Sequence, residues 1–329
     1  MQCIFQGDDL TVYQNVFFDG ANQGGIAAVC FSAWTSAAEG KRFGEGFFSR
    51  NKIPAFFIVQ RSNHWWHTSE IWSALDCIRS ILLDKGLGSI CYGSSMGGYG
   101  SVHFSKYLYS SMAVAVGPQL FVNEDVIPEE KRWVQERKKI EFLFDEVSNL
   151  KKSSVETIVF FDNFNAPDNL QVERCQSRVP ASNVKYIACP YTMHDAVRVL
   201  VKDDRFKMFL IDCFSGNFSG FDGVDGFEEH CLSVYAADDK AFLNWARNVQ
   251  GIKSLSTQDR ERLIDIFGCY KGLRFQELFM LAQALLKIGF YKEAVLCSLE
   301  SMKKYPKPEI PPYMWSKHES VLGVALENL

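Results

Sequence analysis

The chain reads Gly-Ser-Ser-Met-Gly-Gly-Tyr-Gly at residues 93–100, directly after the apolar run Ser89–Tyr92. That run predicts a buried strand, and the helical spacing of apolar residues in Ser101–Tyr109 predicts a helix after the turn. A serine in a G-x-S-x-G motif between a strand and a helix is typical of a nucleophile elbow, a turn so tight that glycines must flank the serine. Ser95 is therefore the candidate nucleophile, and the alternative is a glycine-rich turn with an incidental serine.

Length and composition describe a soluble globular protein. The chain has 329 residues, of which 47% are hydrophobic and 22% charged, enough for one large domain and a smaller one. A net charge of -4 gives no general excess of basic residues, so nucleic acid is not an expected partner. The ten cysteines contain no C-x-x-C pair, which favours reduced thiols. With no basic leader, signal core or apolar run of membrane-spanning length, we expect a cytoplasmic protein without a membrane span.

The first 213 residues alternate between strand and helix patterns, which predicts a mostly parallel sheet of the α/β class with helices on both faces. Two short runs at the start predict an antiparallel edge. Ser69–Leu83 has helical spacing with Ser69 as the expected cap, and Ala196–Cys213 predicts one amphipathic helix. Residues 118–150 interrupt the alternation, as a lid insertion or as a solvated connecting helix. The runs that predict strands are Cys3–Gln6, Leu10–Gln14, Ile26–Ser32, Ala55–Gln60, Met112–Val116, Thr157–Phe161 and Val184–Cys189.

A change of pattern predicts the domain boundary. Residues 215–226 break all periodicity, so we expect a catalytic domain at 1–214, a linker at 215–228 and a helical domain at 229–329. Four helical patterns follow, at Ala241–Val249, Thr257–Phe267, Phe275–Ile288 and Lys292–Tyr305. Phe275–Pro306 resembles one tetratricopeptide repeat, because six residues fall at the offsets expected for it: Ala282, Leu285, Gly289, Tyr291, Ala294 and Pro306. Ser301 is a departure, since the repeat usually has alanine there. Because such repeats need neighbours to bury their faces, a short helical array is expected.

Serine needs a base to take its proton and a third group to orient that base. His194 follows a predicted strand in a loop before a helix, where such a base belongs. Asp162 ends one strand and Asp168 lies six residues later at a predicted helix start, so either could orient His194, and the loop position favours Asp168. Asp195 is a weaker third choice because it is adjacent to His194.

An oxyanion hole needs two backbone N–H groups. Met96 follows the nucleophile and supplies one, and Trp34, in the loop after the Ile26–Phe31 strand, is the expected source of the second. Residues 63–66 leave another strand on the same side of the sheet, and these candidate substrate-binding residues are Asn63, His64, Trp65 and Trp66. A helix-entry loop packed on the core is the alternative. No metal site or cofactor is expected, since no carboxylate or cysteine accompanies His64 and His67 in sequence.

Residues 20–213 resemble the α/β-hydrolase superfamily, on the elbow at 93–98 and on the order Ser95, Asp162 or Asp168, His194. The resemblance implies an α/β-hydrolase-type sheet followed by a small all-helical domain, and acyl transfer through an acyl-serine. The elbow sequence Gly-Ser-Ser-Met-Gly-Gly-Tyr at 93–99 is similar to that of intracellular esterases. A hydrolase-like domain followed by tetratricopeptide-like helices also resembles, more distantly, bacterial proteins associated with surface-polysaccharide biosynthesis.

The function expected from these residues is a serine hydrolase that cleaves a carboxylic ester. The substrate would be a small-molecule or glycan acyl ester, and the C-terminal helices could bind a protein partner. One alternative is an acyltransferase with the same three residues, in which a hydroxyl or amine replaces water. The other is a protein-interaction module whose hydrolase domain is degenerate, because a fold alone does not guarantee activity.

Overall fold

The computed structural model describes residues 1–18, 24–35, 42–180, 182–216, 224–235, 238–248, 255–306 and 310–329. The chain divides into two compact units, Met1–Cys231 and Leu232–Leu329. Residues 217–223 of the predicted linker lie outside the described residues, and the predicted domain bounds stay a prediction.

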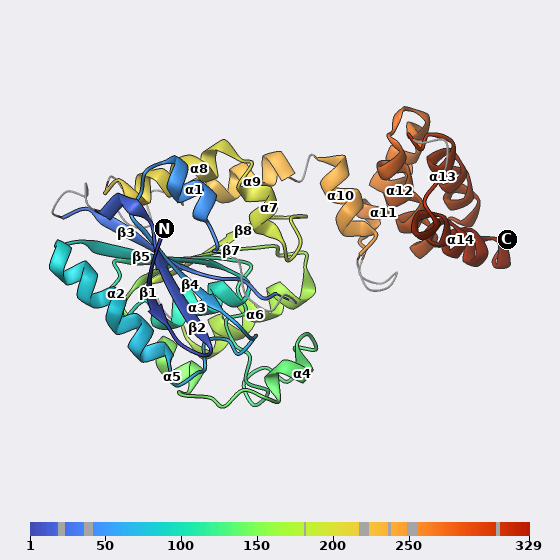
Figure 1. The fold of residues 1–329 in the computed structure, drawn as a ribbon. Coiled ribbons are helices and arrows are strands. Elements are labelled where there is room, and N and C mark those ends of the chain that lie inside the picture. Colours follow the sequence, from blue (N-terminus) through green and yellow to red (C-terminus); the bar gives the residue numbers. More distant parts are fainter. Residues whose placement is uncertain are drawn as a thin grey trace. The chain divides into compact units, whose positions relative to one another are not determined.

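The first unit is built on an eight-stranded sheet (Figure 1). Its order is β1-β2-β4-β3-β5-β6-β7-β8. The pairs β1/β2 and β2/β4 are antiparallel, and all other neighbours are parallel, which confirms the α/β class and the antiparallel edge. The strands are β1 (Gln2–Gln6), β2 (Leu10–Gln14), β3 (Ile26–Phe31), β4 (Ala55–Gln60), β5 (Gly88–Ser94), β6 (Met112–Val116), β7 (Glu156–Phe161) and β8 (Val184–Ala188).

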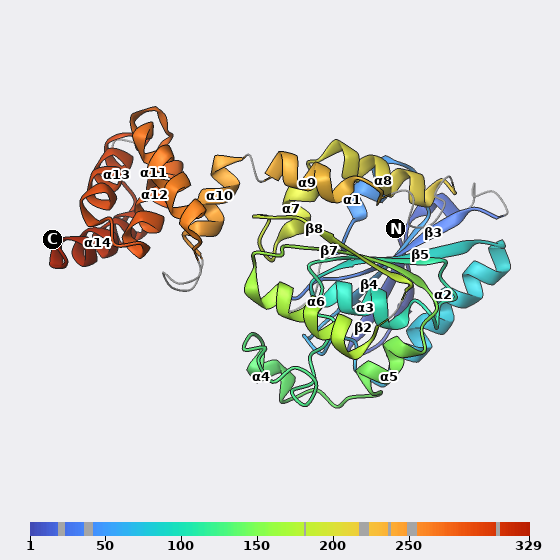
Figure 2. The same ribbon diagram turned by 180° about the vertical axis from the view of Figure 1, so that it is seen from behind.

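Helices cover both faces of the sheet, with α1 and α8 on one face and α2, α3 and α6 on the other (Figure 1, and from behind in Figure 2). Parallel strands need such cover, because each is buried on both sides. The described helices of this unit are α1 (Glu45–Arg50), α2 (Ile71–Lys85), α3 (Met96–Phe104), α4 (Val134–Arg137), α5 (Glu146–Lys151), α6 (Ala166–Arg178), α7 (Ala196–Leu200), α8 (Asp204–Phe214) and the 3-10 turn η1 (Val16–Phe18).

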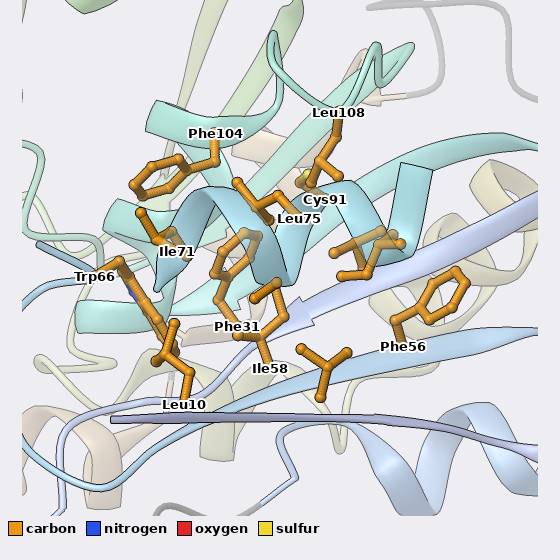
Figure 3. Packing of buried hydrophobic residues seen from close by; sticks show 14 of the residues in the cluster. Leu10, Phe31, Phe56, Ile58, Trp66, Ile71, Leu75, Cys91, Phe104 and Leu108 are labelled. Carbon is orange, nitrogen blue, oxygen red and sulfur yellow. The ribbon is translucent and has the colours of Figure 1, made fainter. Parts of the chain in front are cut away.

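The core beneath α2 and α3 is a continuous aromatic and aliphatic cluster (Figure 3). Helix α2 buries residues at three- and four-residue intervals, as an amphipathic helix on a sheet does. On the opposite face, the ring of Phe160 in β7 lies 5.2 Å from Phe206 and 5.6 Å from Phe209, both in α8. Figure 3 labels Leu10, Phe31, Phe56, Ile58, Trp66, Ile71, Leu75, Cys91, Phe104 and Leu108 of the cluster.

Two helix boundaries differ from those predicted. Helix α2 has Glu70, not Ser69, at its N-cap, and the Glu70 carboxylate accepts hydrogen bonds from the backbone N–H groups of residues 8–10 in the β1–β2 turn. The single helix expected over 196–213 is broken into α7 and α8. Asp203 starts α8 by accepting hydrogen bonds from the N–H groups of residues 205 and 206, so a strong cap ends the periodic stretch.

The insertion at 118–150 contains only the short helices α4 and α5, and buried side chains fix the rest. The guanidinium of Arg137 donates to three backbone carbonyls of the insertion, those of Val122, Ile127 and Glu130. The Glu146 carboxylate accepts from the N–H groups of Val122 and Asn123 at 2.9 and 3.1 Å. The side chains of Arg137 and Glu146 therefore pair with backbone C=O and N–H groups that no helix or strand pairs.

The second unit is helical in its described residues. Within it, α12 and α13 pack against each other, and the Ser301 hydroxyl donates to the carbonyl of Phe275 at 2.6 Å. Whether this pair is a tetratricopeptide repeat stays a prediction. In the described parts of the chain, no helix has the length and apolar character needed to cross a membrane. Helix α9 (Phe227–Tyr235) crosses the division, and α10 (Asp239–Ala246), α11 (Thr257–Gly268), η4 (Tyr270–Gly272), α12 (Phe275–Lys287), α13 (Tyr291–Lys303) and α14 (Pro312–Glu327) follow.

Candidate active site

The elbow lies where β5 ends and α3 begins. Ser95 separates them with φ 56° and ψ -121°, a backbone conformation that residues with a side chain rarely adopt. A Cβ atom on Gly93 would lie 2.0 Å from the carbonyl oxygen of Gly97, and one on Gly97 would lie 2.2 Å from the carbonyl oxygen of Phe31. Because these neighbours are backbone atoms, they cannot rotate away. Close packing of strand and helix therefore requires the two glycines of the motif.

Three of the predicted residues meet at this elbow. The Oγ of Ser95 lies 2.9 Å from Nε2 of His194, and Nδ1 of His194 lies 2.9 Å from Oδ1 of Asp168. Each comes from the end of a different strand: Ser95 follows β5, Asp168 lies in the first turn of α6 after β7, and His194 lies in the loop between β8 and α7. A hydroxyl, an imidazole and a carboxylate in this order can pass a proton from serine to histidine.

The other acids make different contacts. Asp162, at the end of β7, accepts hydrogen bonds from the N–H groups of Phe164 and Met193 at 2.9 and 2.7 Å. Burial raises the pKa of Asp162 to about 6. Through Met193 it fixes the loop that carries His194. Asp195 pairs with Arg198 on the surface at 2.6 Å.

Gln119 joins this group and was not predicted. It is fully buried, and its Nε2 lies 3.0 Å from Ser95 Oγ. The indole N–H of Trp65 donates to Gln119 Oε1 at 3.2 Å, which orients the amide with its NH₂ group toward Ser95. The Ser95 hydroxyl proton then has a better acceptor in His194 Nε2, at 2.9 Å, than in Gln119 Oε1, at 3.3 Å. The signal in the sequence was its place just after β6, at the strand ends where the elbow lies.

Arg132 is the second residue that sequence reasoning missed. Its Nη1 lies 2.8 Å from Asp168 Oδ1 and 3.1 Å from His194 Nδ1. Its Nη2 and Nε hold the carboxylate of Glu130 at 2.7 and 3.0 Å. No periodic pattern marks this part of the insertion, so no sequence signal placed Arg132 at the site.

The ion pair between Glu130 and Arg132 shifts the pKa values of both partners. Burial alone would raise the pKa of Glu130, but the hydrogen bonds and charge of Arg132 outweigh it and hold the pKa below its ordinary value. Burial opposes the charge of Arg132, yet Glu130 and Asp168 raise its pKa above the ordinary value. Glu130 and Arg132 are therefore both charged at neutral pH.

The loop that carries Trp34 is held by side chains at the end of β4. Gln60 donates to the carbonyl of Ala33 at 2.7 Å. The side chain of Asn63 accepts from the N–H of Thr35 at 3.1 Å and donates to its carbonyl at 2.7 Å. These bonds fix the backbone on both sides of Trp34. The oxyanion roles of Trp34 and Met96 stay predictions.

The remaining residues of the 63–66 run contact the elbow and each other. Trp66 donates its indole N–H to the carbonyl of Met96 at 3.0 Å, and its backbone N–H donates to His64 Nδ1 at 3.0 Å. Trp65 and Trp66 are fully buried. Asn63, His64, Trp65 and Trp66 therefore support the elbow and the Trp34 loop, and contact with a substrate stays a prediction.

A second buried polar group lies beneath the elbow helix. The Tyr99 hydroxyl lies 2.7 Å from Nε2 of His67, and the N–H of Leu143 donates to His67 Nδ1 at 3.1 Å. Burial lowers the pKa of His67 to about 3 and raises that of Glu146 to about 7.

In the part of the chain that the structure describes, no three His, Cys, Asp or Glu side chains are grouped so that they could hold a metal ion.

No protein-family model and no curated protein matches the chain. Solved structures do. A capsule O-acetyltransferase of Neisseria meningitidis serogroup A is 14% identical with a TM-score of 0.45, over 62% of this chain and 92% of that one. A glycosylation-associated protein complex (Gap123) of Streptococcus agalactiae gives 14% and 0.47, over 60% and 43%. A lidless serine hydrolase of Xanthomonas campestris gives 12% and 0.41, over 66% and 89%. The architecture stands on the chain's own geometry: Met1–Cys231 holds a mostly parallel eight-stranded sheet with the elbow after β5, as expected from the resemblance to the α/β-hydrolase superfamily.

Proposed function

We propose that Met1–Cys231 is a serine hydrolase unit that cleaves carboxylic esters through an acyl-serine intermediate. The observation that carries the proposal is the pair of 2.9 Å distances that join Ser95 to His194 and His194 to Asp168. The strained backbone of Ser95 supports it too, because such strain is kept where the surrounding structure imposes it and clusters at active sites.

In the first step, Ser95 Oγ attacks the ester carbonyl while its proton passes to His194 Nε2. Asp168 Oδ1 accepts a hydrogen bond from Nδ1–H of His194, which selects the tautomer with a free lone pair on Nε2 and stabilises the imidazolium. The backbone N–H groups of Met96 and Trp34 would hold the oxyanion. The imidazolium then gives its Nε2 proton to the departing alkoxide, which leaves as the alcohol.

In the second step, a nucleophile releases the acyl group from Ser95. Water gives the acid, with His194 again taking and returning the proton. A hydroxyl or amine in place of water gives acyl transfer by the same residues. Product analysis with candidate acceptors, compared with water alone, distinguishes the two reactions.

The test is covalent labelling of the full chain by a fluorophosphonate probe. Wild-type protein is expected to be labelled and Ser95→Ala to be unlabelled, because the probe bonds to the activated serine. Ser94→Ala, a change at the neighbouring buried serine, is the matched control and should keep labelling. Unlabelled wild-type protein would reject the proposal and favour a degenerate hydrolase domain. A labelled Ser95→Ala variant would reject Ser95 as the nucleophile.

A further inference from the structure

Two donors converge on one oxygen at the candidate site. Asp168 Oδ1 lies 2.9 Å from His194 Nδ1 and 2.8 Å from Arg132 Nη1. A guanidinium nitrogen can only donate, and the tautomer that lets His194 act as a base also donates from Nδ1. Arg132 Nη1 and His194 Nδ1 lie 3.1 Å apart because both donate to the same oxygen, and they do not hydrogen-bond to each other. The permanent positive charge of Arg132 therefore lies in contact with the imidazole.

The position of Arg132 is built into the fold. Glu130 holds it with both carboxylate oxygens, and one of these oxygens also accepts the backbone N–H of Arg132 at 2.9 Å. Gln171, one turn after Asp168 in α6, donates to Glu130 Oε2 at 3.1 Å and pairs with the backbone of Phe121. The Glu130 and Asp168 side chains are each 1% exposed, against 20% for Arg132. The guanidinium thus has fixed anchors on both sides.

An aspartate in contact with a histidine favours the imidazolium, and a nearby cation opposes it. Arg132 also donates a hydrogen bond to Asp168 Oδ1, the same oxygen that accepts from His194, so it fixes the position of that oxygen. We propose that Arg132 is a positioning residue of the acid–base pair: it anchors Asp168 and keeps His194 unprotonated, and so able to act as a base, at lower pH. This inference rests on the proposed function of Ser95.

The charged groups that face His194 from the described elements are few. Asp168 comes from α6, and Arg132 with its partner Glu130 comes from the insertion. Asp162, after β7, acts through the N–H of Met193. On the histidine's own element, Asp195 and Arg198 form a solvent-exposed pair, which water and salt screen. Arg132 is therefore the cation in closest contact with the imidazole among these groups.

The test measures the probe-labelling rate of the full chain against pH. Arg132→Met removes the charge and keeps an unbranched apolar stem, and we expect the acid limb of the profile to move up by roughly 1 pH unit. Glu130→Gln removes one of the two carboxylates that pair with Arg132, so the net positive charge beside His194 rises and the acid limb should move down. Arg198→Met is the matched control and should leave the midpoint unchanged, because its pair is exposed. Arg132→Lys keeps the charge and should restore most of the wild-type midpoint.

The inference is supported if the midpoint of the acid limb moves up in Arg132→Met and down in Glu130→Gln. A purely structural loss would not shift the two midpoints in opposite directions. An unchanged midpoint in Arg132→Met, or movement of both variants in the same direction, overturns it. If Arg132→Met does not fold, Glu130→Gln decides alone: a lower midpoint supports the inference and an unchanged one rejects it. Wild-type protein that is not labelled at any pH would remove the proposed function, whereas a labelled wild type with unshifted variants would remove only the role of Arg132.

Discussion

Gly97→Ala tests whether close packing at the elbow is needed for both stability and activity. The added Cβ would lie 2.2 Å from the carbonyl oxygen of Phe31 and 2.9 Å from that of Ser32. To reach ordinary van der Waals separation, α3 and β3 must move apart by about 1 Å. Overpacking costs about 1–3 kcal/mol, and the upper end applies here because both partners are backbone.

A loss of about 3 kcal/mol lowers the melting temperature of a unit of this size by roughly 6–12 °C. Tryptophan fluorescence reports mainly on this unit, because it holds five of the seven tryptophans of the chain: Trp34, Trp65, Trp66, Trp72 and Trp133. Probe labelling should slow as well, because the displaced Phe31 precedes the loop with the candidate oxyanion donor.

Gly46→Ala is the matched control. It also lies within a helix, α1, but its Cβ would meet no atom within 4 Å. Replacing glycine by alanine in such a helix should raise the free energy of unfolding by about 0.5–1 kcal/mol. A Gly97→Ala protein that melts and labels like wild type would refute the packing argument.

Three further predictions concern buried polar groups. Asp168→Asn should slow probe labelling by about 10⁴-fold, because the histidine loses the acceptor that sets its tautomer, whereas Asp162→Asn should slow it less than about tenfold; equal losses would contradict this assignment. Gln119→Leu should slow labelling by about 3- to 10-fold and, by leaving the Trp65 indole N–H unpaired, lower the free energy of unfolding by about 1–3 kcal/mol, both measured on one preparation. Glu146 has its pKa raised from 4.5 to about 7, so its proton stabilises the fold fully below pH 4.5 and the benefit is lost as pH rises through 7. The stability of wild type relative to Glu146→Gln, measured by denaturant unfolding, should therefore fall by about 3 kcal/mol over that range, and a pH-independent difference would contradict the raised pKa.

The sheet could be predicted because its signals are local in sequence. A parallel strand covered on both faces reads as a continuous apolar run, and all six residues of β4 are buried. The elbow could be found because Gly93 and Gly97 are forced by contacts within a few residues of Ser95 and with the adjacent strand. His194 was named from its place after a strand, and the fold brings it to Ser95.

The contacts around the acid could not be predicted, because they depend on chain placement across long separations. Arg132 reaches Asp168 across 36 residues and His194 across 62, from an insertion with little regular structure. The choice between Asp162 and Asp168 depended on where α6 begins. Since that helix starts at Ala166, Asp168 falls in its first turn, while Asp162 stays at the strand end and holds the loop.

These anchors bear on whether the insertion could swing open as a lid. Separating residues 130–132 from α6 would leave the almost fully buried carboxylate of Asp168 without Arg132, while Glu130 would move with Arg132. Breaking the buried pair of Arg132 and Asp168 costs about 3–5 kcal/mol, so the separated state would hold less than about 1% of the molecules even before the hydrogen bond from Gln171 to Glu130 is counted. A motion that removed Arg132 would also change the surroundings of His194. We therefore predict that this part of the insertion stays in place beside the candidate site, and that a substrate reaches Ser95 without displacing it.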